Sequence, residues 1–111
     1  MVNSLYANPG QTVTLVVQTT DGYGDRIDGY VPRIENVYFP TLTTAAGYPR
    51  SMNRLELGVY YYNVQLPSDS TALGTFIINI FYRQPGSNAP VWEVFTIQVA
   101  RAFGNSSVSP A

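Results

Sequence analysis

The stretch GVYYYNVQLPSDSTALGTFIINIFYR, residues 58–83, decides the fold class, because its apolar side chains recur at every second position. That period is typical of half-buried β-strands, whereas an amphipathic helix repeats about every 3.6 residues. Two strands are predicted here, residues 59–66 and 75–83, and a link that contains Pro67 joins them. We therefore expect the two strands to pair as a hairpin.

The rest of the chain supports an all-β fold. The segment TVTLVVQTT, residues 12–20, places Val13, Leu15 and Val17 on one face. Further strands are predicted over residues 33–39, 54–57 and 91–99. Eight prolines and nine glycines are spread along the sequence, so no helical window of about ten residues remains. The prediction is a single antiparallel β-sandwich of about seven strands.

The length of the chain indicates one domain. A chain of 111 residues buries roughly two thirds of its unfolded surface, which suffices for one core. We expect this domain to span residues 1–111, with residues 1–10 and 101–111 as terminal arms. The C-terminal arm, RAFGNSSVSPA, has the composition of a disordered tail. We nevertheless expect it to be ordered by a contact with the domain or with a neighbour.

The composition excludes several classes of function. Only 12% of the residues are charged, against a usual share of about 25%. A net charge of -1 provides no field that attracts nucleic acid. The absence of cysteine excludes a disulfide scaffold and a thiolate nucleophile. No apolar run approaches the roughly 18 residues of a membrane span, and no signal peptide is recognised, so we expect synthesis in a host cytoplasm and no membrane contact.

One face of the last three predicted strands is wholly apolar, and we expect it to form the core. Its members are Tyr60, Tyr62, Val64, Leu66, Phe76, Ile78, Ile80, Tyr82, Phe95, Ile97 and Val99. In the first hairpin, Gln65 is expected to pair with Ile77. Tyr61 then lies opposite Phe81 on the outward face.

The second hairpin extends this outward face. Its expected pairs are Ile80 with Phe95, Phe81 with Val94, and Arg83 with Trp92. An apolar row then stands where solvent would favour polar side chains. The candidate interface residues on it are Tyr61, Ile77, Phe81, Trp92 and Val94.

Two interpretations of this row remain open. Tyr61 and its neighbours can be interface anchors, because aromatic residues are enriched where proteins meet. Alternatively, another part of the same chain covers them, most simply residues 102–111, where Phe103 is a further candidate contact. Either way, the face is expected to be covered.

The sequence offers little for catalysis. General acid–base and nucleophilic chemistry usually uses His, Cys, Lys or paired carboxylates, and the first three are absent. The densest carboxylates are Asp21, Asp25 and Asp28 in DGYGDRID, but they lack the alternating ligands and final Glu of an EF-hand loop. Turn geometry explains them more simply, with Asp25 paired to Arg26 or a neighbour. We expect a non-enzymatic protein without metal or cofactor.

Three short motifs resemble immunoglobulin-like and macroglobulin-like β-sandwich modules, namely Gly58-Val59-Tyr60, Leu66-Pro67 and Gly74-Thr75-Phe76. In such modules a Gly-x-Tyr strand that ends in Leu-Pro precedes a second Gly-x-aromatic strand. The likeness covers about residues 10–100, without the Cys pair and Trp of antibody domains. It implies an immunoglobulin-like sandwich with Tyr60 in the place of a tyrosine corner.

A stand-alone module of this kind is similar to accessory virion proteins of tailed bacteriophages, especially capsid decoration proteins. The resemblance implies a structural protein on the virion surface. It would bind the major capsid protein, tail or neck subunits, or a second copy of itself.

A carbohydrate-binding or host-adhesion module is the alternative function, because exposed aromatic rings can stack on sugars. Its candidate residues are Tyr23, Tyr30 and Tyr48, in loops beside Asp21 and Asp28. Two or three coplanar rings would be needed for such a platform.

Overall fold

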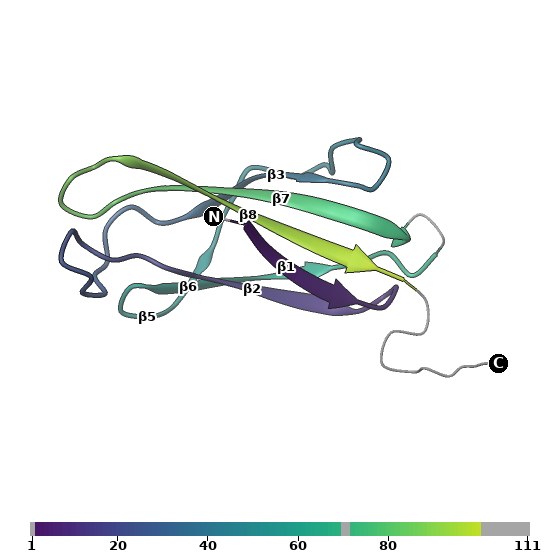
Figure 1. Ribbon diagram of the computed structural model, residues 1–111, viewed down its shortest axis with the longest axis horizontal. Helices are drawn as coiled ribbons and strands as arrows, with labels where there is room; N and C mark the ends of the chain where they lie inside the picture. Colours follow the sequence, from purple (N-terminus) through teal and green to yellow (C-terminus); the bar gives the residue numbers. More distant parts are fainter. Residues whose placement is uncertain (1, 70–71, 101–111) are drawn as a thin grey trace.

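The computed structural model describes residues 2–69 and 72–100, which form two β-sheets packed face to face (Figure 1). The larger sheet has the strand order β1-β8-β7-β3-β4 and the smaller sheet the order β2-β6-β5. The strands are β1 (Val2–Ala7), β2 (Thr12–Gln18), β3 (Arg33–Tyr38), β4 (Arg50–Ser51), β5 (Asn53–Glu56), β6 (Val59–Gln65), β7 (Gly74–Arg83) and β8 (Pro90–Val99). Within the described residues, no helix has the length and apolar character needed to cross a bilayer. The predicted all-β sandwich is confirmed, and the described part of the chain forms eight strands where about seven were expected.

The chain changes sheet repeatedly. It crosses between the layers from β1 to β2, from β2 to β3, from β4 to β5 and from β6 to β7. The groups β2-β6-β5 and β8-β7-β3-β4 have the order of strands B-E-D and G-F-C-C′ in an immunoglobulin-like sandwich. The two sheets form a β-sandwich, as predicted.

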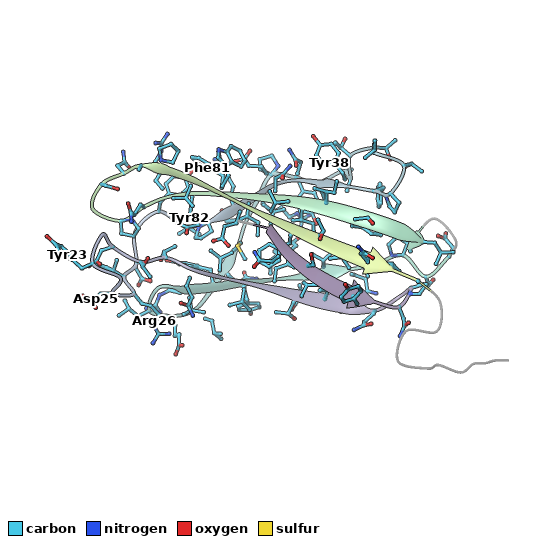
Figure 2. All side chains as sticks on the ribbon, viewed as in Figure 1. Tyr23, Asp25, Arg26, Tyr38, Phe81 and Tyr82 are labelled. Atoms are coloured by element: carbon cyan, nitrogen blue, oxygen red, sulfur yellow. The ribbon has the colours of Figure 1, made fainter. Side chains whose placement is uncertain are left out.

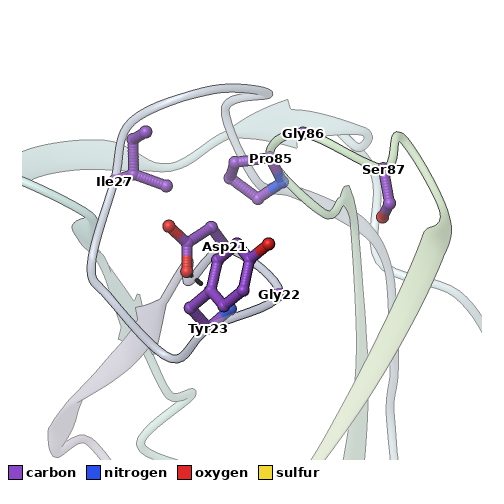
Figure 3. A pocket seen from close by; sticks show the side chains of 7 residues that line it. All are labelled: Asp21, Gly22, Tyr23, Ile27, Pro85, Gly86 and Ser87. Atoms are coloured by element: carbon purple, nitrogen blue, oxygen red, sulfur yellow. Dashed lines mark hydrogen bonds between the residues drawn. The ribbon is translucent and has the colours of Figure 1, made fainter.

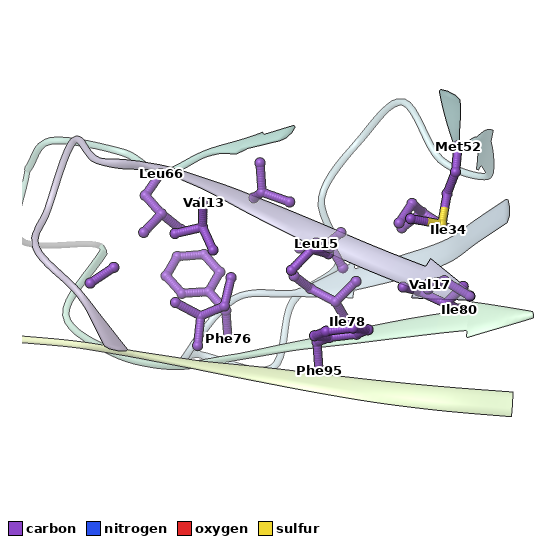
Figure 4. Packing of buried hydrophobic residues seen from close by; sticks show 14 of the residues in the cluster. Val13, Leu15, Val17, Ile34, Met52, Leu66, Phe76, Ile78, Ile80 and Phe95 are labelled. Carbon is purple, nitrogen blue, oxygen red and sulfur yellow. The ribbon is translucent and has the colours of Figure 1, made fainter. Parts of the chain in front are cut away.

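Alternation along the strands supplies a core between the two sheets (Figure 4). Strand β2 alternates strictly, with Val13, Leu15 and Val17 buried and the side chains between them exposed. The larger sheet contributes the predicted residues Phe76, Ile78, Ile80, Tyr82, Phe95, Ile97 and Val99, all of them buried. The smaller sheet contributes Tyr60 and Val64, while Tyr62 is half-buried at the margin.

Strands β6 and β7 do not form the predicted hairpin, because they belong to different sheets. Gln65 pairs with a residue of β2 rather than with Ile77. Tyr61 lies opposite Val16 rather than Phe81. Two strands that each have one apolar face can bury it side by side in one sheet or across the core from each other. Alternation alone does not distinguish these arrangements.

Strands β7 and β8 do pair, but their register is shifted by two residues from the prediction. The observed pairs are Ile80 with Glu93, Phe81 with Trp92, and Arg83 with Pro90, in place of Phe95, Val94 and Trp92. An even shift keeps every side chain on the same face of the sheet. The predicted faces are therefore correct, although the predicted partners are wrong.

The N-terminal residues form strand β1, although the prediction places residues 1–10 in a terminal arm. Strand β1 pairs in parallel with β8, so the sandwich is not wholly antiparallel as predicted. Ala7 is buried and Leu5 packs against the core, which explains why this segment joins the sheet. The other predicted arm, residues 101–111, lies outside the described residues.

Ile80→Ala should lower the free energy of unfolding by about 2–5 kcal/mol, because Ile80 is fully buried and its truncation leaves a cavity between the sheets. Urea unfolding followed by circular dichroism measures the loss. Ile77→Ala, on the opposite face of β7, is the matched control and should cost about 1 kcal/mol or less. Equal losses in the two variants would contradict the assignment of the faces.

Candidate functional site

Five side chains gather on the outer face of the larger sheet and form the strongest candidate for an interaction site. Arg33, Phe81 and Trp92 lie side by side on β3, β7 and β8. Tyr30, which precedes β3, and Arg83, at the end of β7, complete the group, which we call the Trp92 cluster. Trp92 is 53% exposed, whereas its neighbour Phe81 is only 9% exposed.

The Trp92 cluster is built around the ring of Phe81. Figure 2 labels Phe81 on the larger sheet. The ring centroid of Trp92 lies 4.9 Å from that of Phe81, and Tyr30 meets Phe81 edge to face at 5.7 Å. The guanidinium carbons of Arg33 and Arg83 lie 5.7 and 5.5 Å from the Phe81 centroid, within the range of cation–π contacts. Phe81 thus faces outward, as predicted, and these four side chains cover it.

Both arginines of the Trp92 cluster are held in place. The Nε group of Arg33 donates a hydrogen bond to Glu35, which raises the pKa of the Arg33 guanidinium above its usual value. The Nη1 group of Arg83 donates to the carbonyl oxygen of Asn88 at 3.2 Å. A guanidinium group has several N–H donors in a fixed fork. Each arginine can therefore also donate to an acceptor on a partner.

The other predicted interface residues are divided between surfaces. Ile77 and Val94 share the outer face of the larger sheet with the Trp92 cluster, and both are half-buried. Tyr61 lies on the outer face of the smaller sheet, so both sheets separate it from Phe81. Phe103 lies outside the described residues. The prediction of one continuous row is therefore wrong, because its members belong to two opposite faces.

Sequence reasoning did not assign Tyr30, Arg33 or Arg83 to the candidate surface. Arg33 reaches Phe81 only because β3 pairs with β7, a pairing between segments far apart in the chain. Tyr30 lies in an irregular loop, where no period indicates the direction of a side chain. The sequence signal for Tyr30 and Arg33 was their type alone, whereas the predicted register had already placed Arg83 opposite Trp92.

The carboxylates in the loop between β2 and β3 hold the loop itself together. The Oδ1 atom of Asp21 accepts hydrogen bonds from the backbone N–H groups of Tyr23, at 2.8 Å, and Asp25, at 3.1 Å. Asp21 thus holds a turn, as predicted. Arg26 pairs with Glu56 at 3.1 Å rather than with Asp25. Within residues 2–69 and 72–100, no group of three or more Asp, Glu, His or Cys side chains is placed to hold a metal ion.

Asp28 fastens the same loop to the turn between β5 and β6. Its Oδ1 atom accepts from the backbone N–H of Gly58 at 2.9 Å and from the hydroxyl of Tyr60 at 3.2 Å. Its Oδ2 atom accepts from Nε of Arg54 at 3.0 Å. The Gly58 hydrogen bond, together with the charge of Arg54, lowers the pKa of Asp28. The expected tyrosine corner is wrong, because Tyr60 lies on β6 and donates to a side chain rather than to a backbone group.

Backbone hydrogen bonds also join this loop to the turn between β5 and β6, and we call the contact the Asp28 and Gly58 junction. The N–H of Thr19 donates to the carbonyl oxygen of Gly58 at 2.8 Å, and the N–H of Ile27 donates to that of Thr19 at 3.1 Å. The hydroxyl of the fully buried Thr19 donates to the Ile27 carbonyl at 2.7 Å. Gly58 has φ = 68°, and a Cβ atom there would lie 2.8 Å from the Ile27 nitrogen and 2.9 Å from the Thr19 oxygen. Only glycine fits this position without movement of the backbone.

The three loop tyrosines proposed as a sugar platform do not lie together. Tyr30 belongs to the Trp92 cluster. Tyr48 packs against Tyr62, with ring centroids 6.2 Å and hydroxyl oxygens 3.3 Å apart, and burial raises the pKa of Tyr48 to about 12. Tyr23 projects from one end of the molecule and is 93% exposed (Figure 2). A platform of these three rings is therefore not formed.

Comparison with known proteins assigns no family. No protein-family model matches the chain, and no curated protein matches it either. The candidate sites rest on the sequence and on the geometry described above.

Gly58→Ala should lower the free energy of unfolding by about 1–3 kcal/mol or more, because the new Cβ meets backbone atoms and the residue has a left-handed φ. Gly22→Ala is the matched control in the neighbouring loop. A Cβ at Gly22 meets nothing within 4 Å, so its effect should stay within about 0.5 kcal/mol. Urea unfolding of both variants measures the difference. Similar losses of unfolding free energy in the two variants would contradict the close backbone contacts at Gly58.

Asp28→Asn should reduce the loss of thermal stability that the protein shows as the pH falls. Because the pKa of Asp28 is lower in the folded state, its ionised form stabilises the fold above the unfolded value of about 4, and this contribution is lost as the pH falls through the lowered pKa. The variant should melt below the parent at neutral pH, and the gap should close in acid. A constant gap between pH 7 and about pH 2 would contradict the assignment.

Proposed function

We propose that this protein is a non-enzymatic structural protein that binds a neighbouring protein through the Trp92 cluster. The observation that carries the proposal is a half-exposed tryptophan beside two positioned arginines on an outer sheet face. Tryptophan, tyrosine and arginine are enriched among the residues that dominate binding energies. The Trp92 cluster contains all three types.

The cluster is ordered before any partner binds. Trp92 and Tyr30 pack on Phe81, and hydrogen bonds to Glu35 and Asn88 restrain the arginines. Side chains that are already restrained lose less conformational entropy on binding, so more of the contact energy appears as affinity.

The surrounding face offers a partner both apolar and polar contacts. A standard interface buries about 800 Å² on each partner. Ile77 and Val94 supply apolar area beside the cluster, and Asn36 and Asn79, joined by a 2.7 Å hydrogen bond, supply polar groups on the same face. A patch of apolar centre and polar surroundings is the usual anatomy of an interface.

The resemblance to accessory virion proteins directs the proposal to a viral particle. The partner would be the major capsid protein, or a tail or neck subunit, and the protein would stabilise or decorate the virion surface. The low charged fraction supports a protein that works against neighbours, and the lack of His, Cys and Lys supports a role without catalysis.

Trp92→Ala should weaken binding to assembled particles by about 30-fold or more, because truncation removes the exposed anchor of the cluster. Cosedimentation of labelled protein with particles measures occupancy, after circular dichroism has confirmed the fold of each variant. Leu42→Ala, an exposed apolar residue in another loop, is the control and should bind within about threefold of the parent.

A third variant, Tyr61→Ser, tests the opposite face of the sandwich. It should bind as the parent does if the Trp92 cluster is the contact. Loss of binding in Tyr61→Ser with full binding in Trp92→Ala would move the interface to the smaller sheet. Sedimentation velocity without particles shows whether the partner is a second copy of the chain.

A further inference from the structure

A hollow of about 600 Å³ opens at one end of the sandwich, between the loop that joins β2 to β3 and the turn that joins β7 to β8 (Figure 3). The loop contributes Asp21, Gly22, Tyr23 and Ile27, and the turn contributes Pro85, Gly86 and Ser87. This volume lies within the range of about 300–1,000 Å³ that is usual for small-molecule sites. None of these residues belongs to the Trp92 cluster.

The two walls of the hollow are fixed in position. The Asp28 and Gly58 junction holds the loop, and a Cβ atom at Gly29 would lie only 3.1 Å from the Pro85 ring, so loop and turn are in close contact. The turn is closed by the N–H of Gln84, which donates to the Ala89 carbonyl at 2.8 Å. The hollow is therefore a preformed site rather than a gap between mobile segments.

Tyr23 gives the hollow an aromatic wall. Its side chain is 93% exposed, so one face of the ring is open to a ligand. The face of an aromatic ring carries partial negative charge and attracts the weakly positive C–H groups of an apolar surface. Pro85 and Ile27 add apolar side chains to the lining of the hollow (Figure 3).

Asp21 gives the hollow an oriented acceptor. Its Oδ1 atom is held by the backbone N–H groups of Tyr23 and Asp25, which fixes the plane of the carboxylate. A carboxylate has acceptor capacity on both oxygens, so Oδ2 can accept hydrogen bonds from a ligand. The lining residues carry this one carboxylate and no cationic side chain, so an anionic ligand is disfavoured.

We propose that this hollow binds a neutral carbohydrate. One face of a sugar ring presents C–H groups that stack on Tyr23, while its hydroxyl groups donate to Asp21 at the edge of the same ring. The combination of one open aromatic face, apolar side walls and an immobilised carboxylate matches a ligand that is apolar on its faces and hydroxylated at its rim. This site shares no residue with the Trp92 cluster, so each of the two proposals is tested by its own variants and ligands.

Saturation-transfer NMR and calorimetry on the whole chain test the proposal. The neutral probes are tetrasaccharides of glucose, mannose, galactose and N-acetylglucosamine, and the other probes are heparin tetrasaccharide and a proline decapeptide. At least one neutral probe should bind with a dissociation constant of about 1 mM or tighter. Amide shifts on binding should centre on residues 21–27 and 85–87.

Three variants locate the site. Tyr23→Ala should weaken binding about tenfold or more. Asp21→Asn keeps an Oδ1 acceptor for the turn and should weaken binding by a smaller factor. Tyr6→Ala removes another exposed tyrosine, on β1, and should leave the affinity unchanged.

Four results would overturn the proposal. They are no binding of any neutral probe at about 10 mM, preferred binding of heparin or of the proline peptide, equal affinity of Tyr23→Ala and the parent, or amide shifts centred elsewhere. The shift map uses the unmodified chain, so the proposal stays testable even if a variant misfolds.

Discussion

The hydrogen bonds to the Asp28 carboxylate are the constraint on which the arrangement of both candidate sites depends. The loop after β2 must leave the smaller sheet and reach β3 in the larger one. Residues 22–29 of this loop are all exposed, so apolar burial contributes little to the path of that segment. Asp28 instead attaches the loop to Gly58, Tyr60 and Arg54 of the smaller sheet before the crossing. Tyr30, two residues later, then reaches Phe81 from a defined direction.

Two kinds of interaction therefore stabilise this protein, namely apolar packing and directional hydrogen bonds. The sheets are joined by apolar side chains such as Leu15 and Ile78, whose contribution grows with buried area and needs no exact direction. The end of the sandwich depends on directional polar contacts at Thr19, Asp28 and Gly58. The loops can thus lose their order while the sheets remain packed, and the surfaces formed by those loops are the more sensitive part of the molecule.

The sequence predicted the strand faces better than the strand partners. Alternation placed Ile78 and Phe95 in the core correctly, because the side-chain period of a strand is a local property. It did not separate Tyr61 from Phe81, since that depends on whether β6 and β7 share a sheet. The role of Asp28 was also beyond reach, because its partners lie about 30 residues away and a turn carboxylate has the same sequence signature.

The position of Trp92 makes the larger sheet observable by a simple spectroscopic method. It is the single tryptophan of the chain, so all indole fluorescence comes from one place. Its ring is half exposed, 4.9 Å from the ring of Phe81, and the guanidinium groups around Phe81 lie nearby. Any molecule that settles on this face removes water from the indole and changes its emission. The indole of Trp92 thus reports binding to the outer face of the larger sheet. The lining of the hollow at the end of the sandwich contains no tryptophan that could report binding there.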